Sequence, residues 1–128
     1  MDTLSLDRLL IAAGAIPAFV GVGLGAFGAH GLRKRLDADM LAVFEVGVRY
    51  QLYHALALIG GGAAAGRLAP GPLQAAGILF VLGTLVFSGS LYILSMTGRK
   101  WLGAVTPLGG LALLAGWASL AWAALAAS

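Results

Sequence analysis

Long apolar stretches, separated by short clusters of charged residues, make up most of the chain. Four of these stretches contain no Asp, Glu, Lys or Arg, and a membrane-spanning helix needs about 20 such residues. Strands of a membrane β-barrel would instead alternate apolar and polar residues, which these stretches do not. The pattern therefore predicts an all-α integral membrane protein whose four spanning helices cover about residues 9–29, 46–66, 73–96 and 105–126.

The connection between the first two spans is different, because residues 30–49 carry seven of the thirteen charged residues. Apolar residues nevertheless recur there every three or four positions, at Leu41, Phe44, Val48 and Leu52. This spacing predicts an amphipathic helical connector over about residues 37–49, with Asp37 or Asp39 as its N-terminal cap. The connector either lies in the membrane interface as a separate helix or continues directly into the second span.

The other connections are short. Residues 67–72 predict a proline-containing turn, and residues 97–100 predict a tight basic turn. Short connections join antiparallel neighbours, so we predict an up-down four-helix bundle that forms a single transmembrane domain over residues 1–128. Pro107 is expected in the first turn of the last span, where a missing N–H group is tolerated. A bend within a longer helix is the alternative for Pro107.

Basic residues near the ends of the spans predict the orientation. The first and third connections carry Arg33, Lys34, Arg35, Arg49, Arg99 and Lys100, whereas the opposite side carries only Arg8 and Arg67. This asymmetry predicts a multi-pass protein of the plasma (inner) membrane, with the first and third loops in the cytoplasm and both termini outside. Cleavage of the first span as a signal peptide, near residues 25–29, is an alternative, although acidic residues offset Arg8 ahead of the span.

Composition agrees with a membrane protein and excludes several chemistries. Hydrophobic residues make up 60% of the chain, charged residues make up 10%, and the mean hydropathy is +0.95. The absence of cysteine excludes disulfides, iron–sulfur clusters, thiolate zinc sites and cysteine nucleophiles. The basic loops account for the net charge of +3. These loops indicate that the protein's partner is the lipid bilayer, in particular its anionic headgroups. The positive charge therefore does not imply that the protein binds nucleic acid.

Twenty glycines lie mainly within the apolar stretches. Small residues spaced by four positions allow membrane helices to approach each other closely. We therefore assign a helix-packing role to Gly21 and Gly25 in the first span, Gly62 and Gly66 in the second, and Gly109 and Gly110 in the fourth. The same faces could instead join copies of the chain in a homo-oligomer, or join the chain to another membrane protein.

No charged residue lies near the centre of a span, and the polar residues gather toward the predicted cytoplasmic side. The candidate polar or ligand cluster consists of His30, Glu45, Arg49, Tyr50, His54, Ser88 and Tyr92. A hydroxyl stripe also follows one face of the third span, at Thr84, Ser88, Tyr92 and Ser95.

Three interpretations of this cluster stay open. The first is an interfacial layer of tyrosines with hydrogen bonds between helices. The second is a site for a small molecule or a headgroup, and the third is a haem or metal site on His30 and His54. Two histidines without a dedicated third ligand form a weak zinc signature. We therefore expect no metal and no cofactor.

Four sequence blocks together resemble a known family. They are GAFGAHGL at residues 25–32, FEVGVRYQLYHAL at 44–56, FSGSLY at 87–92 and LGAVTPLGG at 102–110. In this order they resemble the YgdD-like family of small bacterial inner-membrane proteins, a domain of unknown function with a eukaryotic transmembrane branch. The resemblance implies a multi-span protein of the plasma membrane and no established activity, so it transfers no catalytic residue.

The sequence contains no Ser–His–Asp arrangement, phosphate-binding loop or metalloprotease motif. We therefore expect a protein that is not an enzyme and that acts as an accessory, scaffold or interaction component of the membrane. A small oligomeric transporter or channel is one alternative. A binder of a small molecule, haem or metal at the cytoplasmic-side polar layer is the other.

Overall fold

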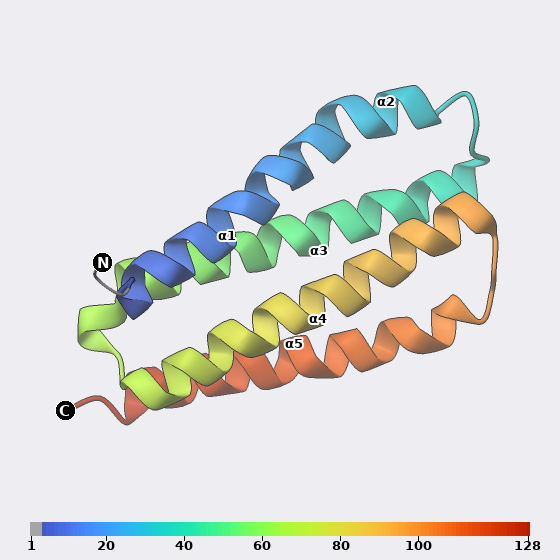
Figure 1. Ribbon diagram of the computed structural model, residues 1–128. Coiled ribbons are helices and arrows are strands. Elements are labelled where there is room, and N and C mark those ends of the chain that lie inside the picture. The colour runs from blue at the N-terminus through green and yellow to red at the C-terminus, as the bar shows by residue number, and fades with distance from the viewer. Residues whose placement is uncertain (1–3) are drawn as a thin grey trace.

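The computed structural model describes residues 4–128, and every long element in that part of the chain is a helix. The elements are α1 (Leu6–Gly23), the π-helical η1 (Leu24–Gly28), α2 (Ala29–Leu32), α3 (Ala38–Ala63), the 3₁₀ turn η2 (Ala65–Arg67), α4 (Pro70–Thr97) and α5 (Leu102–Leu125). The all-α prediction is confirmed. Figure 1 shows the chain reversing direction at each connection between long helices, with both termini at the same end.

The first long helix runs continuously through α1, η1 and α2, but its hydrogen bonding changes near its end. η1 is a single π-helical segment, and such segments are rare insertions within α-helices. Pro17 lies inside α1 without ending it. The predicted first span therefore lies within one apolar helix that extends from Leu6 to Leu32.

The charged connector is the beginning of α3, and it is not a separate helix. The side chain of Asp37 accepts a hydrogen bond of 2.8 Å from the backbone N–H of Met40, which identifies Asp37 as the N-terminal cap. From Ala38 the helix continues without a break to Ala63. The connector is therefore continuous with the helix that contains the predicted second span, over residues 46–63.

The turn between α4 and α5 changes the expected place of Pro107. Gly98 ends α4 in the left-handed region, with φ of 70°, and its N–H bonds the carbonyl oxygen of Leu94 at 2.7 Å. Consecutive i→i−3 bonds then start α5 at Leu102, so Pro107 lies inside this helix. The first-turn prediction for Pro107 is wrong. Its missing N–H removes one helical hydrogen bond, the one to the carbonyl of Gly103.

Three helices are long and apolar enough to cross a membrane, namely Leu6–Leu32, α4 and α5. α3 is not among them, because its middle part contains Arg49, Gln51 and His54. Two of these polar side chains are buried in the protein, with exposed fractions of 6% for Gln51 and 4% for His54. A helix that other helices cover can carry polar groups that a lipid-facing helix could not.

The four long helices form a row rather than a closed ring. The extensive helix-to-helix contacts join α1 to α3, α3 to α4, and α4 to α5, whereas α1 and α4 touch only at a few points. The larger apolar core consists of Leu10, Leu58, Leu73, Ala76, Phe80, Leu113 and Ala123, and a smaller one of Ala29, Phe44 and Val48. α3 and α4 are the inner members of this row (Figure 1).

Several glycines lie where two helices touch. A Cβ atom at Gly62 would be 2.7 Å from the backbone oxygen of Asp7, and one at Gly109 would be 2.5 Å from the backbone nitrogen of Phe87. The other glycines with an assigned packing role differ from one another. Gly21 and Gly25 face side chains of α3, Gly110 has only ordinary contacts to Phe87, and Gly66 faces open space. Similarly short distances occur at Gly14, Gly47, Gly77, Gly83 and Gly116.

We expect Gly109→Ala to destabilise the contact between α4 and α5, because its Cβ would overlap backbone atoms that cannot rotate away. Overpacking of this kind lowers the free energy of unfolding by about 1–3 kcal/mol. The matched control is Gly110→Ala in the same helix, whose Cβ would lie 3.8 Å from the Phe87 ring. Unfolding of the purified protein by SDS, followed by circular dichroism, measures both effects. Equal effects of the two substitutions would contradict the close approach at Gly109.

Candidate functional site

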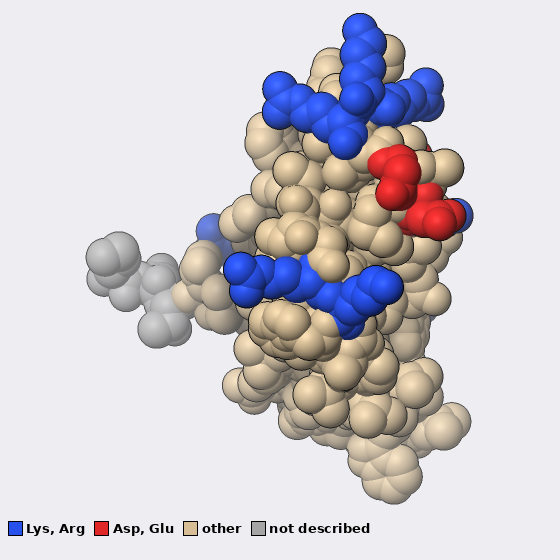
Figure 2. Space-filling view, turned by 90° about the vertical axis from the view of Figure 1, so that its right-hand side faces the viewer, with Lys and Arg blue, Asp and Glu red and all other residues tan. Residues whose placement is uncertain are grey.

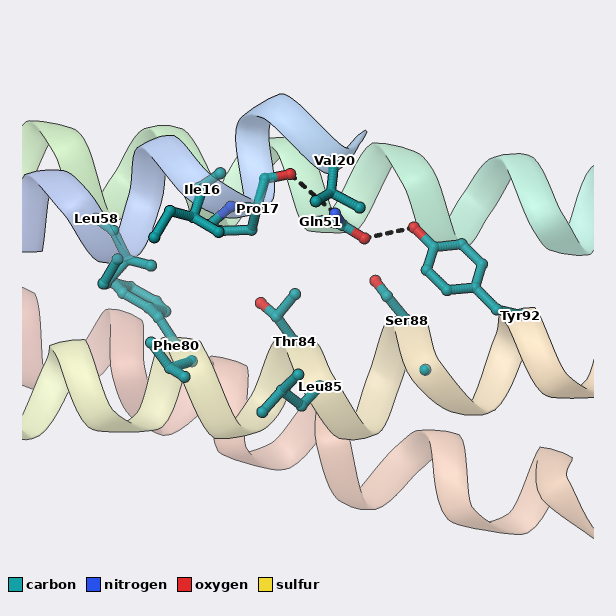
Figure 3. A pocket seen from close by; sticks show the side chains of 14 residues that line it. Ile16, Pro17, Val20, Gln51, Leu58, Phe80, Thr84, Leu85, Ser88 and Tyr92 are labelled. Atoms are coloured by element: carbon teal, nitrogen blue, oxygen red, sulfur yellow. Dashed lines mark hydrogen bonds between the residues drawn. The ribbon is translucent and has the colours of Figure 1, made fainter. Parts of the chain in front are cut away.

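Gln51 connects three helices through one side chain. Its Nε2 atom donates a hydrogen bond of 2.8 Å to the carbonyl oxygen of Pro17 in α1, and its Oε1 atom accepts one of 2.6 Å from the hydroxyl of Tyr92 in α4. Both bonds are drawn in Figure 3. The amide therefore satisfies its oxygen and one N–H group inside the protein, away from lipid.

Two further hydroxyl contacts join neighbouring helices. Ser88 in α4 is buried and donates a hydrogen bond of 2.6 Å to the carbonyl oxygen of Gly47 in α3. Ser90 lies on another side of α4, and its hydroxyl oxygen is 2.5 Å from that of Thr106 in α5. Hydrogen bonds between helices help to hold membrane proteins together where no water competes for them.

The two hydrogen bonds of His54 determine its tautomer. The Nε1–H group of Trp117 in α5 donates to Nε2 of His54 at 3.0 Å, and indole nitrogen is only a donor. Nε2 is therefore the unprotonated nitrogen, and Nδ1 carries the proton that bonds the carbonyl oxygen of Tyr50 at 2.6 Å. The imidazole is neutral, and neither ring nitrogen has a free lone pair for a metal or a haem iron.

The structure divides the seven residues of the candidate cluster into two groups. His54 and Ser88 are buried and Tyr92 is half-buried, whereas His30, Glu45, Arg49 and Tyr50 are exposed. His54 contacts Phe80 and Trp117 in the interior of the helix row and does not meet His30, which lies in α2. Within residues 4–128, no group of three His, Asp or Glu side chains is placed to hold a metal ion.

The exposed charged pair lies beside the π-helical segment. Glu45 and Arg49 line a shallow groove of about 240 Å³ together with Gly25, Ala29 and Val48. No salt bridge joins the two charged side chains in the described part of the chain. They are therefore separate from the buried hydrogen bonds of Gln51, His54 and Tyr92.

Sequence reasoning did not place Gln51 or Trp117 in the cluster. A signal for Gln51 was present, since an amide in the middle of a helix predicted to cross hydrocarbon needs partners there. Trp117 gave no such signal, because tryptophan is common near membrane interfaces. Its partner lies 63 residues away in the sequence, so only the fold brings the two side chains together.

A side cavity of about 370 Å³ lies between α1, α3 and α4. It is the hollow seen in Figure 3, and the residues that line it include Pro17, Gln51, Phe80, Ser88 and Tyr92. Thr84 also lines it. The hydroxyl oxygen of Thr84 is buried and has no hydrogen-bond partner. Thr84 belongs to the hydroxyl stripe of α4, but the structure leaves its hydroxyl unpaired while Ser88 and Tyr92 bind α3.

Comparison with known proteins gives matches over nearly the whole chain. The family model "Protein of unknown function (DUF423)" matches residues 24–110. The membrane protein YwdK of Bacillus subtilis is 46% identical over 92% of this chain and 97% of its own length. A membrane protein of Staphylococcus haemolyticus is 47% identical over 88% and 92%, and the inner membrane protein YgdD of Escherichia coli is 39% identical over 88% and 86%. No solved structure matches the chain.

The apolar helices and these relatives define a class of small integral membrane proteins whose biochemical activity is unknown. The chain belongs to the DUF423 family, whose curated relatives are named UPF0382 membrane proteins. The resemblance drawn from the four sequence blocks is therefore confirmed. The family model includes Gln51, His54, Thr84 and Tyr92, whereas Trp117 lies beyond its end.

We expect Tyr92→Phe to weaken the connection between α3 and α4, because it removes the one hydrogen bond that the amide oxygen of Gln51 accepts within residues 4–128. Loss of one such bond lowers the free energy of unfolding by about 0.5–1.5 kcal/mol. Tyr53→Phe is the control, because the Tyr53 side chain is exposed on the same helix as Gln51. Unfolding in SDS measures both, and an equal loss of stability in the two variants would contradict the role of the Tyr92–Gln51 bond.

Proposed function

We propose that α3 is the fourth membrane span and that the four long helices cross the bilayer in up-down order. α3 has 26 residues, which correspond to a length of about 39 Å, more than the roughly 30 Å of the hydrocarbon core. Its charged first turns can therefore lie outside the hydrocarbon while the remainder crosses it. Coverage by α1 and α4 supports this placement, because it shields Gln51 and His54 from lipid.

The distribution of basic side chains supports an orientation with the first and third loops in the cytoplasm. Arg33, Lys34 and Arg35 precede α3, and Arg99 and Lys100 precede α5, so both connections lie at one end of the helix row. Figure 2 views this end and shows its Lys and Arg side chains in two groups. Such a surface suits the cytoplasmic leaflet, whose anionic headgroups attract Lys and Arg.

We propose that the protein acts without catalysis, as an accessory or interaction component of the membrane. The observation that carries this is the state of the buried polar groups. His54 is held neutral by two bonds, and Ser88 donates to a backbone carbonyl, so neither forms the nucleophile–base pair that covalent catalysis needs. These groups join helices together and leave no activated side chain among those described.

The interaction surface that we propose is the outer face of α5. This helix is the last of the row and packs extensively only against α4. Large apolar side chains are exposed along its other side, at Leu108, Leu111, Leu114, Trp122 and Leu125. A helix of another membrane protein could pack along this face through van der Waals contacts.

Single-cysteine labelling tests the four-span topology, since the chain has no cysteine of its own. Ala38 and Ser128 are both exposed. In intact cells, a membrane-impermeant maleimide should label Ser128→Cys and should label Ala38→Cys only after the membrane is permeabilised. Labelling of both positions in intact cells would contradict the orientation and the crossing of α3.

Photocrosslinking in living cells tests the interaction surface. A photoreactive amino acid placed at Leu111 should give a discrete adduct larger than the monomer, because this side chain lies on the proposed face of α5. The control is the same amino acid at Phe19, an exposed residue of α1 at the other end of the row. Adducts with a second copy of the chain would favour self-association instead. Equal adducts at the two positions, or none at Leu111, would contradict the proposed face.

A further inference from the structure

We propose that the cavity between α1, α3 and α4 binds a neutral, largely apolar small molecule that carries a hydrogen-bond acceptor, such as a carbonyl or ether oxygen, and that Thr84 donates to this oxygen. The proposal concerns a different region from the outer face of α5. It therefore stands independently of the accessory role.

The size and the walls of the cavity indicate the kind of ligand. Its volume of about 370 Å³ lies within the range of small-molecule sites, roughly 300–1,000 Å³. No Asp, Glu, Lys, Arg or His lines it, so a charged ligand would lose its hydration without gaining a counter-charge. A neutral and mainly apolar molecule is the chemistry that these walls accept.

The hydrogen bonds around the cavity single out Thr84. Ser88 and Tyr92 each use their one hydroxyl proton on α3, at Gly47 and Gln51 respectively. The hydroxyl oxygen of Thr84 is also buried but has no partner among residues 4–128, although threonine in a helix often bonds its own i−4 carbonyl. Thr84 lies midway along α4, where membrane hydrocarbon supplies no water. An acceptor on a bound molecule would satisfy this proton.

The cavity opens sideways between α1 and α4, where these helices touch only at a few points. Ile16 and Leu85 both line it and are 67% and 66% exposed, so its mouth faces the surrounding lipid. A phospholipid could insert an acyl chain there, but its own carbonyl groups stay at the interface, far from Thr84. The acceptor must therefore belong to a molecule that dissolves in the hydrocarbon.

Benzophenone is a suitable probe, because it has one carbonyl group between two apolar rings and forms covalent adducts under near-ultraviolet light. Full-length protein in lipid nanodiscs is irradiated with it, and the adducts are located by peptide mass spectrometry. We expect adducts on residues of the cavity wall, reduced about fivefold by Thr84→Val, which removes the hydroxyl at nearly constant shape. Thr84→Ser should retain them. In competition with benzophenone for the cavity, diphenylmethane, which lacks the carbonyl, should reduce the benzophenone adducts less than 4-methylbenzophenone does.

A second variant tests the cavity itself without touching Thr84. Gly89 lines the cavity, and a Cβ added there meets no atom within 4 Å, so Gly89→Leu can fill the space without displacing the backbone. It should abolish the adducts on the wall. Gly103→Leu is the control, since Gly103 is an exposed glycine of α5 with equally open surroundings. SDS unfolding midpoints establish that each variant is folded.

Two results would overturn the proposal. Adducts spread evenly over lipid-facing residues, and unchanged by Gly89→Leu, would show partitioning into the bilayer rather than binding. Adducts confined to the wall but unchanged in Thr84→Val would show that the space accepts any apolar molecule and that the hydroxyl does not select for an acceptor.

Discussion

The burial of α3 between α1 and α4 is the constraint on which the rest of the structure depends. In hydrocarbon every polar group must find its partner within the protein. Gln51 and His54 lie in this one helix, and their partners come from α1, α4 and α5, as well as from the preceding turn of α3. α3 is thus the long helix with the least apolar sequence, and its polar side chains require the inner position that it holds in the row.

Much of the helical framework could be predicted from where charges are absent. The gaps between charged residues predict apolar helices over about residues 9–29, 73–96 and 105–126, since only helices suit such stretches in lipid. The structure has apolar helices over Leu6–Leu32, α4 and α5. The start of α5 was less predictable, because the turn after Gly98 begins the helix before Pro107. A proline residue indicates a weak position within a helix, whereas the geometry of the preceding turn determines the residue at which the helix starts.

The candidate site was less predictable for a physical reason. Residue type and depth along a helix suggested that His30 and His54 share a layer, but which way a side chain faces depends on the neighbour that each helix meets. His54 meets Trp117 and Phe80, and His30 remains exposed. The Thr84–Ser88–Tyr92 stripe was visible as a spacing of four, yet only the packing reveals that two of these hydroxyls are paired and one is not.

The π-helical segment η1 affects the direction in which the end of the first helix faces. One residue more than an α-helix needs is accommodated there, and each residue of an α-helix turns the chain by about 100°. α1 approaches α3 through Gly14 and Gly21, and beyond the segment Ala29 faces Phe44 on the same helix. Gly25 inside the π segment faces Val48 of α3, and Gly28 at its end faces Phe44. The π turn thus takes up an extra residue while the first helix keeps contact with the same partner helix on both sides of it.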